Sequence, residues 1–131
     1  MRFLLDTHVL LWMFDESSQI PPKIRDVIAN TENKGFVSIA SLYEIAIKKN
    51  IGKLYTQNSI KTFADETGKV GLELIPITTK QLEEYVILPI NSSHKDPFDR
   101  LLIATAIAEN LSLITADEKF RLYSSLVNII W

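Results

Sequence analysis

Five short apolar runs alternate with helical patterns along this chain. The runs lie at residues 3–5, 35–38, 72–77, 111–115 and 127–130. Runs of this length fit buried strands, and the segments between them carry apolar residues three or four positions apart, as helices do. Strands separated by helices are joined by crossovers, which make neighbouring strands parallel and place helices on both faces of the sheet. The alternation therefore predicts an α/β fold built on a mostly parallel sheet.

Prolines, glycines and apolar spacing locate the helices. Pro21-Pro22 is a good helix opening, and Gly52 suits the end of the helix that opens at Ser41. Residues 88–95 are predicted to form a loop. The other predicted helical segments begin near residue 9 or span residues 59–67, 79–87, 97–110 and 117–123.

Length and charge limit the classes of protein that fit. A chain of 131 residues has the size of one ordinary domain, so we expect a single domain over residues 1–131. Its 14 basic and 16 acidic residues leave a net charge of −2, so a nucleic-acid or membrane partner would need a local patch. The absence of cysteine excludes disulfides and thiolate metal sites. Asp6 and His8 interrupt the apolar N-terminal run, which favours a soluble cytoplasmic protein over a secreted or membrane-spanning one.

Four carboxylates stand where a predicted strand ends or the next helix begins. Asp6 directly follows the first strand, and Asp117 follows the fourth. Glu44 and Asp99 lie in the first turn of predicted helices. In parallel α/β sheets the functional crevice lies beyond the carboxyl ends of the strands. We therefore expect these four side chains to face the same rim.

Helix capping is the competing interpretation of the acids. Ser41 and Glu44 have the spacing of a capping box, in which the acid bonds back to the backbone of the cap residue. Asp96 is a natural N-cap, and Asp99 would sit in the first turn, which the helix dipole makes favourable for an acid. Asp117 could cap its own short helix in the same way.

Asp6 is harder to explain as a cap, because it ends a strand that should be buried. An unpaired charge there costs on the order of several kcal/mol or shifts its pKa. Capping also leaves the recurrence of acids at one predicted edge unexplained, whereas a cation would neutralise converging carboxylates. Hard oxygen donors favour Mg²⁺ or Mn²⁺ over zinc. The pattern therefore indicates metal-assisted phosphoryl chemistry.

The acidic motifs resemble those of PIN-domain ribonucleases. They are Asp6-Thr7 after the first strand, the Ser-x-x-Glu ending at Glu44, Asp99 before an apolar helix, and Thr115-Ala116-Asp117. Two stretches look more closely like VapC-type toxins of bacterial toxin–antitoxin pairs: LLDTHVLLW and HKDPFDRLLIATA. The resemblance runs over nearly the whole chain in the same order. Each motif alone is weak, and the four together with the Asp-Pro-Phe-Asp-Arg string are fairly specific.

This resemblance implies a three-layer α/β/α sandwich around a central, mostly parallel five-stranded sheet. It also implies a Mg²⁺- or Mn²⁺-dependent endoribonuclease, a homodimer, and an antitoxin whose tail blocks the site. Carried over by position, Asp6, Glu44 and Asp99 would hold the metal, and Asp117 would support it directly or through water. A metal-activated water would then hydrolyse an RNA phosphodiester in line.

Further residues receive supporting roles. By the same resemblance, Thr7 and Thr115 would offer hydroxyls that orient the carboxylates. Asp96 is either a helix cap or an outer member of the acidic group. Arg100 would contact RNA or pair with Asp96 or a neighbouring carboxylate.

RNA requires positive charge along its phosphates. The densest basic run is Lys48-Lys49-x-x-x-Lys53, which is either a solvated helix face or an RNA contact. His8 could reach the acidic rim or bond at a helix start. His94 precedes the acidic helix in a polar loop, and a surface position is expected for it.

Three rival functions make different demands on the residues. A phosphoacceptor receiver domain would need adjacent acids after the first strand, where this chain has only Asp6. A phosphatase of the haloacid dehalogenase type would need a second Asp where His8 stands. A catalytically inactive PIN-like module that binds protein or RNA is the serious alternative, because its acids would serve only as caps.

Overall fold

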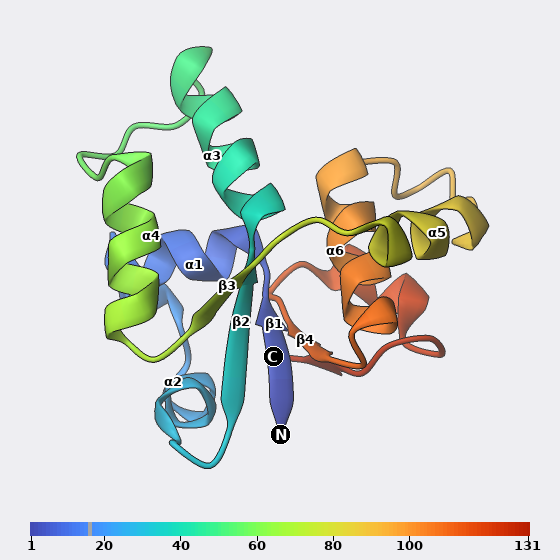
Figure 1. Cartoon of the computed structure of the whole chain (residues 1–131), viewed down its shortest axis with the longest axis horizontal. Coiled ribbons are helices and arrows are strands. Elements are labelled where there is room, and N and C mark those ends of the chain that lie inside the picture. Colours follow the sequence, from blue (N-terminus) through green and yellow to red (C-terminus); the bar gives the residue numbers. More distant parts are fainter. Residues whose placement is uncertain (16) are drawn as a thin grey trace.

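The computed structural model describes residues 1–15 and 17–131. Its strands are β1 (Arg2–Leu5), β2 (Lys34–Ser38), β3 (Glu73–Ile75), β4 (Ser112–Ile114) and β5 (Ile129–Ile130). Its α-helices are α1 (Thr7–Phe14), α2 (Pro22–Ala29), α3 (Ile39–Asn50), α4 (Ile60–Lys69), α5 (Thr79–Ile87) and α6 (Pro97–Ala108). Short 3₁₀ helices are η1 (Ser17–Gln19) and η2 (Glu118–Tyr123). The sheet has the order β3-β2-β1-β4-β5 with parallel neighbours, so the predicted α/β/α sandwich is confirmed (Figure 1).

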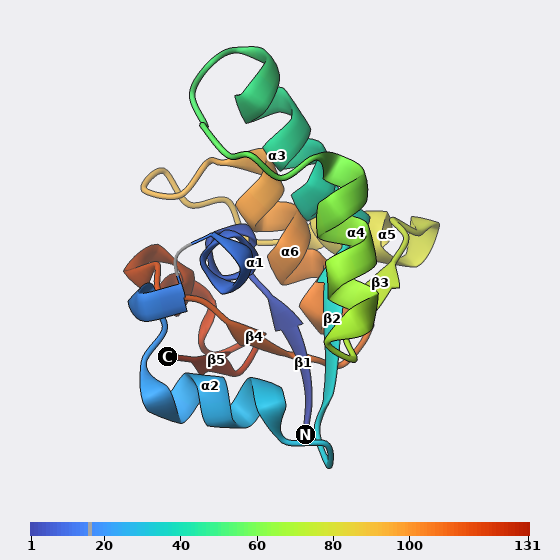
Figure 2. The ribbon, with the colours of Figure 1, turned by 90° about the vertical axis from the view of Figure 1, so that its left-hand side faces the viewer.

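Side chains of the central strand β1 alternate between two hydrophobic cores. Phe3 and Leu5 are fully buried in one core, together with residues of α1, α2 and α4. Leu4, between them in sequence, is fully buried in the other core with residues of α6 and η2. This period of two is the pleat of a strand buried on both faces. Figures 1 and 2 show the result, with α1, α2 and α4 on one side of the sheet and α5 and α6 on the other.

Gly35 lies where the sheet leaves no room for a side chain. A Cβ at this position in β2 would overlap the side chain of Leu72 and the ring of Phe3. Overpacking of a dense core typically costs about 1–3 kcal/mol. We therefore expect Gly35→Ala to lower the free energy of unfolding by about that amount in urea titrations.

Gly68 provides the matched control for this prediction. It lies in α4, where an added Cβ would meet nothing within 4 Å. Alanine at a helical site without crowding is about 0.5–1 kcal/mol more favourable than glycine. Equal effects of Gly35→Ala and Gly68→Ala would contradict the packing at the sheet.

The start of α3 differs from the prediction and moves Glu44. Ser38, the last residue of β2, is the N-cap, and its hydroxyl accepts a hydrogen bond from the Ala40 N–H at 3.1 Å. Strand and helix therefore join without a loop, and the helix begins at Ile39 rather than Ser41. The predicted capping box of Ser41 and Glu44 is wrong, and Glu44 lies in the second turn, not the first.

Other predicted boundaries agree within a few residues. α5 matches its predicted span, and α6 starts at Pro97 as expected but ends at Ala108. The third and fifth strands are shorter than their apolar runs, since only residues 73–75 and 129–130 pair with neighbours. Within the described ranges, no helix has the length and apolar character needed to cross a membrane.

Candidate functional site

The four acids singled out in the sequence collect at the carboxyl edge of the sheet. Asp6 leaves the end of β1, Glu44 projects from the second turn of α3, Asp99 from the first turn of α6, and Asp117 from the link between β4 and η2. Their mutual proximity appears in the electrostatics, because negative charge on Asp6, Glu44, Asp96 and Asp117 adds to the raised pKa of Asp99. Figure 1 shows the ends of β1 and β2 directed toward the starts of α3 and α6.

Asp6 is buried without serving as a cap. It occupies the residue before α1, yet its side chain makes no capping bond there. Only 2% of the residue is exposed, and burial raises the pKa of its carboxyl. The Thr115 hydroxyl donates to Asp6 Oδ2 at 2.8 Å and lowers this pKa in part, as does the positive charge of His8. A carboxylate kept in such a place lacks an adequate positive partner within the described chain.

Glu44 has one oxygen that is paired and one that is not. Its Oε2 accepts from Lys48 Nζ at 2.9 Å, one helical turn along α3. Its Oε1 is buried and has no hydrogen-bond partner among the described residues. A buried unsatisfied acceptor costs about 1–3 kcal/mol, and more when it is charged. An unpaired atom of this kind is where a cation or an ordered water would be expected.

Asp99 is held by a histidine that sequence reasoning placed at the surface. Burial is the largest reason that the pKa of Asp99 rises to about 8, followed by repulsion from Asp96 and Asp6. Its Oδ2 lies 3.0 Å from Nε2 of His94. His94 is only 3% exposed, so the predicted surface position is wrong. Burial lowers the pKa of His94, which favours the neutral ring.

The remaining acids act as caps in the structure. Asp96 is the N-cap of α6, and its Oδ1 accepts from the N–H groups of Phe98 at 2.9 Å and Asp99 at 3.0 Å. Asp117 caps η2, and its Oδ1 accepts from the Lys119 N–H at 2.9 Å. Asp117 also lines a hollow together with Asp6, so capping leaves it at the acidic edge.

The residues predicted to support the acids differ in what they contact. Thr115 bonds Asp6 as described, and its hydroxyl also accepts from the Asp117 N–H at 3.1 Å. The Thr7 hydroxyl donates to Ser41 Oγ at 2.9 Å instead of to a carboxylate. Arg100 is 8% exposed, and its ion pair with Asp96 is not formed. This guanidinium points into the protein, so its predicted contact with a carboxylate is wrong.

The donor set fits a hydrated divalent cation. Within the described part of the chain, no three carboxylates or histidines are close enough to form a ready coordination shell. Mg²⁺ keeps several of its waters and is usually held by one or two carboxylates, so it does not need such a shell. The unpaired Oε1 of Glu44 and the buried Asp6 supply oxygen ligands of the kind that this ion prefers.

Two hollows adjoin at the acidic edge. One, of about 270 Å³, is lined by Asp6, His8, Trp12, Ala116 and Asp117. The other, of about 420 Å³, shares His8 and Trp12. Its further lining residues are Leu11, Asp15, Lys48, Lys53, Leu54 and Tyr55. A continuous surface therefore leads from the carboxylates to two lysines and an exposed tyrosine.

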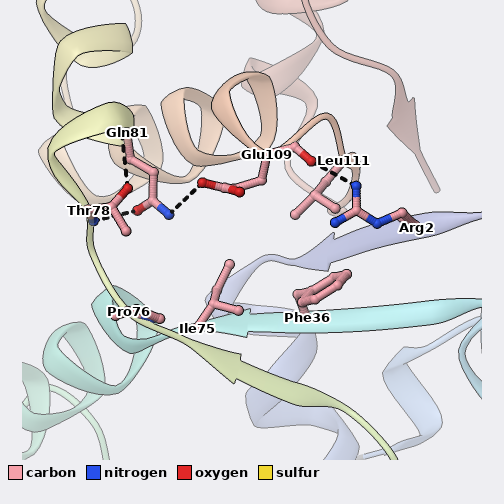
Figure 3. A pocket seen from close by; sticks show the side chains of 8 residues that line it. All are labelled: Arg2, Phe36, Ile75, Pro76, Thr78, Gln81, Glu109 and Leu111. Atoms are coloured by element: carbon pink, nitrogen blue, oxygen red, sulfur yellow. Dashed lines mark hydrogen bonds between the residues drawn. The ribbon is translucent and has the colours of Figure 1, made fainter.

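A third hollow, shown in Figure 3, lies away from the acids beneath α5. Its polar groups bond to one another. Gln81 Nε2 donates to Glu109 Oε1 at 3.4 Å, and Arg2 donates to the Glu109 carbonyl at 3.0 Å. The hollow has a volume of about 120 Å³, and its polar side chains are engaged with one another, so it offers no group for the chemistry of the acidic edge.

Comparisons with known proteins agree with this fold. A family model described as PIN domain matches residues 3–126. The chain is similar to VapBC2 from Rickettsia felis bound to a DNA fragment from its promoter, at 21% identity over 99% of this chain and 98% of that one, with a TM-score of 0.72. VapBC-1 from nontypeable Haemophilus influenzae is similar at 17% identity over 99% and 97%, with a TM-score of 0.68. DNA-bound VapBC from Salmonella typhimurium is similar at 18% identity over 99% of this chain and 97% of that one, with a TM-score of 0.63. At these identities the likeness shows the fold, and no curated protein matches the chain.

Proposed function

The chain belongs to the PIN-domain family, and on that premise we propose that it is a Mg²⁺- or Mn²⁺-dependent endoribonuclease. The observation that carries this proposal is the meeting of Asp6, Glu44, Asp99 and Asp117 at one edge with too little positive charge. The raised pKa of Asp99 and the unpaired Oε1 of Glu44 both record that deficit. A nuclease that works through a bound cation needs such a site, whereas a set of helix caps does not.

The chain's own residues prepare the acids for this role. The Thr115 hydroxyl holds Oδ2 of Asp6, and Lys48 holds Oε2 of Glu44 and leaves Oε1 for a ligand. Asp6, Glu44 and Asp99 would hold the ion, and Asp117 would support it. When bound, the cation would supply Lewis acidity and charge neutralisation for the in-line hydrolysis of a phosphodiester by water.

The adjoining hollow supports single-stranded RNA as the substrate. Trp12 and Tyr55 offer aromatic faces, and Tyr55 is 89% exposed. Lys53 lies in the same lining and would attract phosphates, whereas Lys48 there is paired with Glu44. Stacking of splayed bases on aromatic side chains beside a basic surface is how proteins bind single strands. A base-paired duplex would not present its base faces to these side chains.

The solved structures that this chain resembles are VapBC complexes, as their titles state. We extend that assembly to this chain, and propose that it is the toxin of a toxin–antitoxin pair. Its partner would be a cognate antitoxin protein, and the toxin would be a homodimer acting on RNA in the cytoplasm. The alternative is an inactive binding module, favoured by the caps that Asp96 and Asp117 form. Asp6 argues against that alternative, because it is buried and caps nothing.

Cleavage of a labelled single-stranded RNA by the purified chain tests the proposal. We expect products with Mg²⁺ or Mn²⁺, no products with excess chelator, and recovery when the metal is returned. A duplex of the same sequence should be cut more slowly. Intact RNA in every metal, with protein that is folded and free of any antitoxin, would favour the inactive module.

A further inference from the structure

A buried chain of hydrogen bonds connects Arg100 to Asp99. Arg100 Nη1 donates to the hydroxyl of Tyr123 at 2.9 Å. That hydroxyl lies 3.3 Å from Nδ1 of His94, and Nε2 of His94 lies 3.0 Å from Oδ2 of Asp99. His94 and Tyr123 are 3% and 2% exposed, so the bonds of Tyr123 to Arg100 and His94 are shielded from water, whereas the Asp99 end is partly exposed. These hydrogen bonds connect the acidic edge to buried residues of η2 and α6.

Arg100 and Asp99, at the two ends of this series of hydrogen bonds, determine which group donates and which accepts in each bond. A guanidinium can only donate, so the Tyr123 oxygen accepts from Arg100 and has its own hydrogen to give. A carboxylate that binds a cation is ionised and can only accept. With a cation bound and Asp99 ionised, Nε2 of His94 must therefore carry the proton that is donated to Asp99. Nδ1 is then a bare acceptor, which the Tyr123 hydroxyl satisfies.

Arg100 anchors this series of hydrogen bonds, and further contacts hold both Arg100 and His94 in place. Arg100 also donates to the carbonyls of Pro89 at 3.0 Å and Leu88 at 3.3 Å. The ring of His94 packs against Phe120 and Tyr123, with ring centroids 5.3 Å and 5.4 Å away. Phe120 is fully buried. The imidazole therefore has little freedom to turn, and a fixed tautomer gives it a fixed hydrogen bond to Asp99.

We propose that His94 is a positioning residue. The Arg100–Tyr123 anchor keeps its proton on Nε2, and this N–H holds one oxygen of Asp99 so that the other faces the acidic group. This inference rests on the proposed metal site and adds to it a residue outside the four acids. Nearby groups that orient a ligating carboxylate typically change metal affinity by 10–100-fold when lost. Loss of His94 should therefore lower the metal affinity of the site by the same factor.

Substitutions at His94 separate positioning from packing. His94→Leu fills a similar space but cannot donate, whereas His94→Gln retains an N–H for Asp99 and an oxygen for Tyr123. Mn²⁺ affinity, measured by electron paramagnetic resonance of the free ion, should fall about 10–100-fold in His94→Leu. His94→Gln should recover most of that affinity. Thermal melting of each variant without metal reports any loss of fold separately.

A nuclear magnetic resonance readout tests the tautomer itself. With Mg²⁺ bound, the ¹⁵N shifts of His94 should show a protonated Nε2 and a bare Nδ1. Tyr123→Phe removes the hydroxyl that selects this form, so the shifts should move toward a mixture of tautomers. A protonated Nδ1 in the wild-type protein, or equal Mn²⁺ affinity in wild type and His94→Leu, overturns the positioning role alone. A wild-type protein that binds no Mn²⁺ overturns the metal site and, with it, the positioning role.

Discussion

Asp6→Asn is expected to reduce RNA cleavage by more than the about 10–100-fold that loss of a group supporting a metal ligand costs, while leaving the metal-free protein as stable as the wild type or more stable. Asparagine keeps the shape of the side chain and can still accept from Thr115. It removes a charge whose burial raises the pKa of Asp6, so the folded state no longer bears that desolvation cost. Initial cleavage rates and thermal melting in chelator measure the two effects.

Asp65→Asn is the matched control for this change. Asp65 lies on α4, its pKa is affected by Lys61 and Lys69 and by none of the four acids, and it forms an exposed pair with Lys61 at 2.7 Å. The same chemical substitution there should leave cleavage unchanged. If Asp6→Asn instead lowers the melting temperature by many degrees, Asp6 is a structural residue, and its place in the site is wrong.

The stability of the metal-free protein should fall as the pH rises from about 4 to about 8. The pKa of Asp99 is raised from 3.8 to about 8 in the folded protein. In that window the folded state holds a proton that the unfolded state has released, so increasing pH favours unfolding. Each pKa unit corresponds to about 1.36 kcal/mol, and Asp99 remains 19% exposed, so we expect a loss of a few kcal/mol.

Urea unfolding in chelator across this pH range measures the slope. Asp99→Asn should flatten it in part, leaving the contribution of Asp6, whose pKa is also raised. Saturating Mg²⁺ should restore stability at high pH, because the cation binds the ionised form. A wild-type slope equal to that of Asp99→Asn would mean that Asp99 is solvated like an ordinary surface acid.

Much of this architecture follows from local sequence signals. The apolar strands alternate faces strictly, so Phe3 and Leu4 enter different cores as their positions require. Asp96 followed by Pro97 marks the start of α6 by cap chemistry alone. The position of the acids beyond strand ends follows from the parallel topology. Each of these features depends on neighbours in sequence or on one general rule of sheet connection.

The features that sequence reasoning missed depend on contacts between distant segments. The helix α3 starts at Ile39, with Ser38 as its cap, because β2 runs straight into it, and two serines three residues apart offer the same capping signal. His94 sits in a polar loop, and its burial comes from Phe120 and Tyr123, nearly thirty positions later. Arg100 turns inward because free carbonyls of the preceding loop face it. No pattern in the neighbouring sequence indicates these contacts.

Titration of the metal-free chain with Mn²⁺, followed by electron paramagnetic resonance, tests the role of the acidic edge most directly. We predict saturable binding that Mg²⁺ displaces, that Asp6→Asn abolishes and that Asp65→Asn leaves intact. Equal Mn²⁺ binding by the wild type and Asp6→Asn, or none by either, would contradict a cation site at the carboxyl ends of β1 and β4.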